Sequence, residues 1–283
     1  MNTLDYIKTR QKLWARKTGI SLQGSKIERG DPIYTMRLED NLFQNISDVT
    51  KKEIEQGDGN ELGDGINPGK MQALHSSSVL GINVFEYWKS NKRFRTIAKA
   101  LGISTIGIDF IQFEEKYEVF KNAKKSPNID VNIHYAKNHL IGIECKFTEP
   151  FQFMNQNSGL KEKYIKDFEY WGAFPCLREL ALQISPRDDT FEYLHCAQLI
   201  KHVLGMYTQK QDKSKFSLMY IFQPAYFENN QKYQDELKIL EKALVADGVK
   251  FSFVPWQDLI RKLNDYVEDA DRKYIEYLVE RYL

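Results

Sequence analysis

The sequence lacks the features that stabilise small secreted domains or anchor membrane proteins. Its 3 cysteines, Cys145, Cys176 and Cys196, are scattered and include no C-x-x-C pair. We therefore expect no disulfide framework and no structural zinc site, and we expect a reducing, cytoplasmic compartment. The first residues are charged throughout and no apolar run approaches the roughly 18 residues of a membrane helix, so neither a secretory signal nor a membrane span is expected.

The chain also lacks an excess of charge of one sign. Its 283 residues carry 40 Lys and Arg against 39 Asp and Glu, which gives a formal net charge of +1. This balance argues against indiscriminate binding of nucleic acid through a basic tail, although it can hide local patches. Aromatic residues make up 13% of the chain, so it can build a sizeable core and is not expected to be disordered.

Apolar periodicity divides the chain into two unequal parts. Residues 1–69 are expected to form an N-terminal helix followed by a polar, turn-rich extension, and residues 70–283 are expected to form the main domain. Predicted helices cover 3–18, 71–89, 92–101, 161–171, 174–184, 190–209, 231–246 and 257–282, and predicted strands cover 106–118, 129–135, 140–147, 217–224 and 249–256. This order predicts an α/β fold with a mixed sheet, in which the early strands are antiparallel and the later ones form a parallel crossover.

The most informative segment is the predicted hairpin at 127–150. Within its two strands, odd-numbered residues are apolar or sulfur-bearing, while even-numbered residues, apart from Leu140, are polar or glycine. Side chains alternate between the faces of a strand, so one face is core and the other gathers Asp130, Glu144 and Lys146. If the hairpin is centred near Asn138, Asp130 lies opposite Lys146 and diagonal to Glu144, about 7–8 Å away.

Two carboxylates at this separation suit one hard divalent cation. Mg²⁺ typically takes one or two protein carboxylates and keeps several waters for a phosphate substrate. The ammonium of Lys146, on the same face, is suited to orient or help deprotonate a water, or to offset charge on a phosphate. The alternative interpretation is a solvated sheet face that carries an ordinary cross-strand ion pair.

Asp130, followed after thirteen residues by Glu144-Cys145-Lys146, resembles the signature of the PD-(D/E)XK nuclease superfamily, which has a restriction-endonuclease-like fold. The resemblance covers about residues 70–256. It implies hydrolysis of phosphodiester bonds in DNA, or sometimes RNA, with Asp130 and Glu144 holding Mg²⁺ (Mn²⁺ as a possible substitute) and Lys146 assisting the attacking water. The sequence departs from the signature because Ile129, not proline, precedes the aspartate.

The resemblance implies two further site residues. Many relatives carry an acid on the first helix, and Glu86 has that position here. Some relatives carry Gln or Lys on the helix after the lysine strand, where Gln198, Lys201 and His202 share one side. For each of these residues a place on a solvated surface is the alternative, and it is also the default for Glu114 near the end of the first strand.

Two basic runs next to the hairpin favour a polyanionic partner, which the resemblance identifies as DNA. They consist of Lys89, Lys92, Arg93, Arg95 and Lys99, and of Lys121, Lys124 and Lys125. Symmetric cutting of both strands would favour a homodimer, although no residue identifies an interface. A non-catalytic member of the same fold, which binds nucleic acid or a protein, is the alternative to a nuclease.

Overall fold

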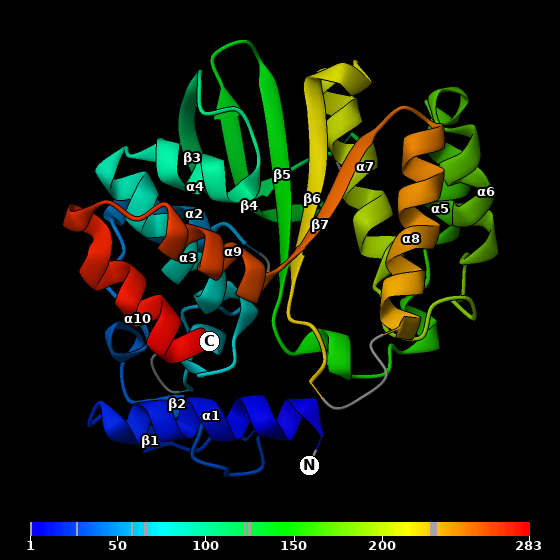
Figure 1. Cartoon of the computed structure of the whole chain (residues 1–283). Helices are drawn as coiled ribbons and strands as arrows, with labels where there is room; N and C mark the ends of the chain where they lie inside the picture. The colour runs from blue at the N-terminus through cyan, green and yellow to red at the C-terminus, as the bar shows by residue number, and fades with distance from the viewer. Residues whose placement is uncertain are drawn as a thin grey trace.

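A five-stranded mixed sheet forms the centre of the protein in the computed structural model (Figure 1). The structure describes residues 2–26, 28–57, 59–64, 67–121, 123, 126–226 and 231–283. The strand order is β3-β4-β5-β6-β7, antiparallel from β3 to β5 and parallel from β5 to β7. The strands are β3 (Ile108–Lys116), β4 (Asn128–Tyr135), β5 (His139–Lys146), β6 (Phe216–Phe222) and β7 (Lys250–Pro255).

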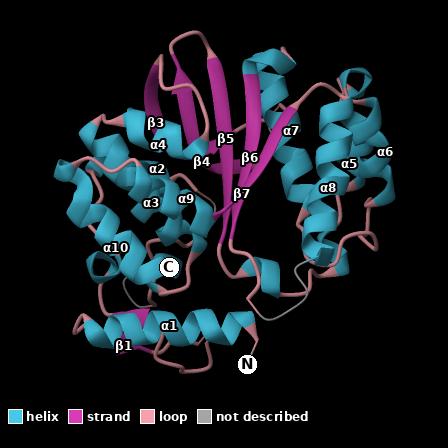
Figure 2. Cartoon of the chain, in the orientation of Figure 1, coloured by secondary structure: helices cyan, strands magenta, loops and turns pink. Residues whose placement is uncertain are grey.

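Helices cover both faces of the sheet (Figure 2). One layer consists of α5 (Glu162–Asp167), α6 (Pro175–Gln183), α7 (Cys196–Lys210) and α8 (Gln231–Ala246). The opposite layer consists of α3 (Ser77–Asn91), α4 (Phe94–Leu101), α9 (Trp256–Asp265) and α10 (Arg272–Tyr282). Within the described residues, no helix combines the length and the apolar character needed to cross a bilayer.

Strand β6 shows why the sheet is buried on both sides. Phe216, Leu218 and Tyr220 join the hydrophobic cluster under α6, α7 and α8, whereas Met219 and Ile221 join the cluster under α3, α9 and α10. A strand flanked by parallel neighbours and covered on both faces reads as a continuous apolar run, as the sequence SLMYIF does. The predicted α/β fold with a mixed sheet is confirmed.

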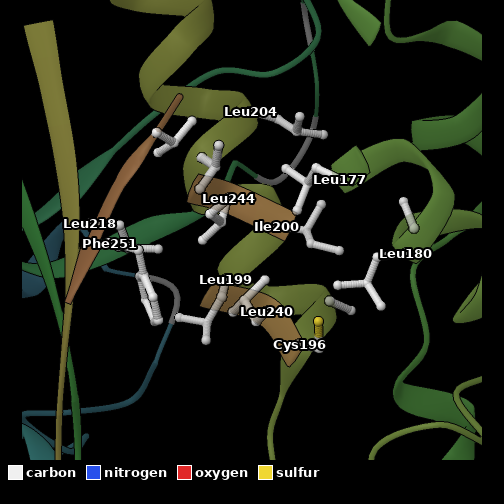
Figure 3. Packing of buried hydrophobic residues seen from close by; sticks show 14 of the residues in the cluster. Leu177, Leu180, Cys196, Leu199, Ile200, Leu204, Leu218, Leu240, Leu244 and Phe251 are labelled. Carbon is white, nitrogen blue, oxygen red and sulfur yellow. The ribbon is translucent and has the colours of Figure 1, made fainter. Parts of the chain in front are cut away.

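Helix α7 is held firmly against the sheet. Figure 3 shows Leu199, Ile200 and Leu204 of α7 among the side chains of α6, α8 and the strands β6 and β7. Burying each such side chain contributes about 1.5–3 kcal/mol. This packing fixes the opposite side of α7, which carries Gln198 and His202, relative to β5.

The N-terminal extension contains α1 (Thr3–Lys17), the small β1 (Leu22–Gln23) and β2 (Tyr34–Thr35) sheet, and α2 (Asp48–Glu55). Helix α1 lies across one end of the layer that contains α3 and α10 (Figure 1). Ile7, Leu42 and Ile54 belong to the same hydrophobic cluster as residues of α3 and α10. The extension is therefore packed on the main domain, and the boundary near residue 69 stays a prediction.

Several predicted helices differ in extent from the observed ones. The helix predicted at 71–89 begins only at Ser77, and the helix predicted at 161–171 ends at Asp167. The single helix predicted at 257–282 is divided into α9 and α10, and the helix predicted at 190–209 begins only at Cys196. Just before α7, the N–H groups of Tyr193 and Leu194 donate to the carboxylate of Glu236 on α8. This long-range contact replaces the hydrogen bonds of a first helical turn and delays the start of α7.

Candidate functional site

The observed register of the hairpin differs by two residues from the register that the sequence predicted. Tyr135 pairs with His139, and Val131 pairs with Ile143, which is the last pair of this ladder before Asp130. The predicted pairing of Asp130 with Lys146 is wrong. The hairpin is centred on residue 137 because Asn138, in the left-handed conformation (φ 58°), closes a tight turn through its N–H to the carbonyl of Tyr135.

Glu144 is the centre of the site and is completely buried. Its Oε1 lies 2.7 Å from the Nζ of Lys146 and accepts a hydrogen bond of 2.7 Å from the Nε2 of Gln198 on α7. Its Oε2 lies 2.9 Å from the Nε2 of His202, one turn further along α7, yet has no hydrogen-bond partner among the described residues. The strand thus supplies the carboxylate and the lysine, and α7 supplies the side chains that orient them.

Asp130 lies where β4 begins to pair with β5. Its Oδ2 accepts a hydrogen bond of 2.7 Å from the backbone N–H of Cys145. With Glu114, Ser77 and Cys145 it borders a small cavity under α3. Glu114 has a φ of 50° and interrupts the regular alternation of β3. Alternation predicted that Asp130, Glu144 and Lys146 share one polar face, but Asp130 borders the α3 side and Glu144 contacts α7.

Lys146 is almost buried among carboxylates. Burial alone would lower the pKa of its ammonium, but the negative charges of Glu144, Glu149 and Asp130 raise this pKa above the ordinary value. Glu149 is itself held in place by the N–H groups of Phe147 and Thr148, each at 3.0 Å. The ammonium is therefore kept protonated and is positioned as a hydrogen-bond donor.

The acids respond differently to this environment. Burial raises the pKa of Glu144, but the charges of Lys146 and His202 outweigh it and lower the value to about 2. Burial raises the pKa of Asp130 well above its usual range, and the charges of Glu144 and Glu114 raise it further. Burial also raises the pKa of Glu114 to about 7, against the opposing hydrogen bond from Asn128. Because the carboxylates repel one another and have few neighbouring cations, a bound cation would be electrostatically favourable at this position.

The chemistry of these donors fits a hard divalent cation. Carboxylate oxygens are the ligands that Mg²⁺ prefers, and the Oε2 of Glu144 is buried without a hydrogen bond. In the part of the chain that the structure describes, no group of three or more His, Cys, Asp or Glu is arranged to hold a metal. Asp130 and Glu144 could therefore supply two ligands, which leaves the other positions for water and phosphate.

Glu86 is not brought to this site. It is buried on α3, where its carboxylate accepts hydrogen bonds from the backbone N–H of Ser47, the hydroxyl of Thr50 and the hydroxyl of Ser90. These contacts fasten the start of α2 to α3. Glu86 therefore has a structural role in this geometry. It does not lie on a solvated helix face, which was the alternative.

The first predicted basic run is partly neutralised. Lys89 forms an ion pair with Glu53, and Arg93 forms ion pairs with Glu268 and Asp271. Of the second run, Lys124 and Lys125 lie outside the described residues. A different group of cations, Lys161, Lys163 and Lys201, lines a cleft of about 810 Å³ next to Gln198 and His202.

Sequence reasoning missed several of these residues. Glu149 follows Lys146 by three positions, and this proximity was the one available signal. Glu162 lies between Lys161 and Lys163, so these two lysines do not form an uninterrupted basic run in the sequence. Glu61, whose charge raises the pKa of Glu114, comes from the N-terminal extension and gave no signal at all.

Comparison with known proteins identifies the family of this chain. A family model described as Restriction Endonuclease associating with ARP matches residues 8–283. Neither the curated proteins nor the solved structures contain a match. The family match covers almost the whole sequence and agrees with the sheet order and with the hairpin. The chain therefore belongs to the restriction endonuclease family described as Restriction Endonuclease associating with ARP.

Proposed function

We propose that this protein is a divalent-metal-dependent nuclease that hydrolyses phosphodiester bonds in DNA. The observation that carries the proposal is the buried ion pair of Glu144 and Lys146. The charges of Glu144 and Glu114 raise the pKa of the nearby Asp130, so the carboxylates here outnumber the cations that could neutralise them. Burying charged groups is costly, and such a cluster is typical of a site that binds a ligand or performs chemistry. The family match supports the nuclease class.

Asp130 and Glu144 would hold Mg²⁺ or Mn²⁺. When bound there, the cation would supply positive charge at the phosphate and lower the pKa of water. Gln198 would keep Glu144 in position through its hydrogen bond to Oε1. The protonated Lys146 would donate hydrogen bonds to the water or to a phosphate oxygen, and it would offset negative charge that develops during attack.

The reaction is a hydrolysis. The oxygen of water forms a bond to phosphorus and that water releases a proton to the solvent, while the phosphorus–oxygen bond to the leaving nucleotide breaks and the leaving oxygen takes up a proton. Among the groups of this chain, Lys146 is the cation placed next to the metal-binding carboxylates, so its loss should affect the chemical step most directly.

Cleavage of supercoiled, linear and single-stranded DNA with Mg²⁺ or Mn²⁺ tests the proposal. We expect Glu144→Gln and Lys146→Met each to lose about 10²–10³-fold in rate, because each removes a group that would stabilise charge in the transition state. Lys166→Ala is the matched control, since Lys166 is an exposed lysine paired with Glu162. It should cut like the unchanged protein.

Cutting that persists in both variants, in proteins with unchanged melting curves, would contradict the proposed roles. No cutting of any DNA, with no stabilisation by either metal, would instead favour the non-catalytic member of the fold.

A further inference from the structure

A basic cleft opens beside the candidate site. It has a volume of about 810 Å³ and lies between α5, α7 and the start of β4. Two residues on its wall, Gln198 and His202, contact the carboxylate of Glu144 from the α7 side. A ligand that fills the cleft therefore reaches the helix side chains that position Glu144.

The charge of the cleft has one sign. Lys161, Lys163 and Lys201 line it, and no Asp or Glu is among the described residues that do. None of the three lysines forms an ion pair within the described part of the chain. Burial lowers the pKa of Lys201, the charges of Lys161 and Lys163 lower it further, and the charge of Glu144 opposes this shift. Neighbouring cations that line one cleft and form no ion pair are suited to a polyanion.

An exposed pair of aromatic rings lies on two segments that lead into the wall of this cleft. The side chain of Phe153 is 72% exposed and stacks on Tyr193, with ring centroids 5.2 Å apart. The N–H of Met154 donates to the carbonyl of Glu192, so the two segments lie side by side. The first segment continues into the cleft wall at residues 157–160, and the second does so at His195.

We propose that the basic cleft binds an unpaired stretch of a DNA strand, with its phosphates on Lys161, Lys163 and Lys201 and a base stacked on Phe153. A base inside a duplex is already covered on both faces, so only an unpaired base can use an exposed ring. Lysines contact phosphates without reading the sequence. The inference rests on the proposed nuclease function and assigns its substrate class, which is DNA with a single-stranded segment.

Binding without cleavage tests this inference directly. Fluorescence anisotropy, with the full chain in EDTA, would compare a labelled single strand, a blunt duplex and a duplex with a single-stranded tail. We expect the tailed duplex to bind more tightly than the blunt one. Phe153→Ala should weaken binding of the single strand about 5- to 150-fold and leave the blunt duplex unchanged, because one stacking contact is lost.

Two matched controls separate this surface from the rest of the molecule. Phe110→Ala removes another exposed ring, which is 43% exposed on the edge strand β3 and stacks on His134 of β4, and this variant should bind all three DNAs normally. Lys201→Ala should lower the slope of log affinity against log salt by about 0.7 for the single strand. Lys166→Ala, exposed on α5, should leave this slope unchanged.

The inference is overturned if Phe153→Ala binds every DNA like the unchanged protein, or if the blunt duplex binds as tightly as the tailed one. Tighter binding of single-stranded RNA than of DNA would overturn the assignment to DNA. The proposed nuclease function is tested separately. Cleavage that survives Glu144→Gln and Lys146→Met would contradict that function, but it would not change the binding measured in EDTA.

Discussion

Arg281 and Glu144 are both charged and almost completely buried, but their surroundings differ. Arg281, on α10, is 1% exposed. It donates hydrogen bonds to the carbonyl and side-chain oxygens of Asn41, to the Oε1 of Gln11 at 3.0 Å and to the hydroxyl of Tyr277 at 2.6 Å. Every side of its guanidinium is used by the protein itself.

Glu144 is hydrogen-bonded less completely. Its Oε1 is close to Lys146 and Gln198, whereas its Oε2 lies 2.9 Å from the Nε2 of His202 but has no hydrogen-bond partner in the described residues. A buried charge with complete partners holds the fold together, and one with incomplete partners is suited to a ligand. The comparison teaches that burial alone does not identify a functional charge, because the state of its hydrogen bonds decides.

The largest expected effect is the loss of stability when the side chain of Arg281 is removed. Arg281→Ala should lower the free energy of unfolding by about 3–5 kcal/mol, because it leaves a cavity and several buried acceptors without donors. Urea denaturation measures this loss. Arg272→Ala, on the same helix but exposed and paired with Asp269, is the control and should change stability by less than about 0.5 kcal/mol. Equal effects of the two would mean that the Arg281 network contributes little.

Glu144 should instead affect stability through metal binding. Mg²⁺ or Mn²⁺ at about 100 times its dissociation constant should raise the free energy of unfolding by about 2.7 kcal/mol, because it binds only the folded state. Thermal melting with and without metal measures the shift. Glu144→Gln should abolish it. A shift that survives this substitution would place the cation elsewhere.

Removing the hydrogen bond of Gln198 should have a smaller effect. Gln198→Leu should lower the cleavage rate or the metal affinity about 10- to 100-fold, because Glu144 loses the amide that orients it. Gln183→Leu, on the exposed end of α6, is the control for a lost amide. Unchanged rates in both variants would show that Lys146 positions Glu144 without help from α7.

The smallest expected effect is a gain of stability at the site. Asp130→Asn should raise the free energy of unfolding by about 0.5–2 kcal/mol in EDTA, because it relieves the repulsion among crowded carboxylates, while cleavage is lost. Asp258→Asn, which removes an exposed partner of Arg261, should not stabilise the protein. A less stable Asp130→Asn protein would show that the hydrogen bond from Cys145 outweighs the repulsion.

The sequence allowed the order of elements and the residues of the hairpin to be predicted, because both depend on local patterns. Alternation along β4 and β5 identified the strands, and the spacing of Asp130, Glu144 and Lys146 identified the acids and the lysine. The register was missed by two residues, since it depends on the conformation of the turn at Asn138. In the structure Gln198 donates a hydrogen bond to Glu144, whereas Glu86 contacts Ser47 and Thr50 instead, and the functional roles of these residues stay predictions.

By itself, then, the sequence determined the α/β class, the mixed sheet and the hairpin that carries the candidate site, because periodicity along a strand or helix follows from neighbouring residues. Only the tertiary structure decided which charges are satisfied. The contact of Arg281 with Asn41 spans 240 residues, and the basic cleft joins α5, α7 and the start of β4. Such contacts depend on how the elements pack, and no pattern within one element encodes them.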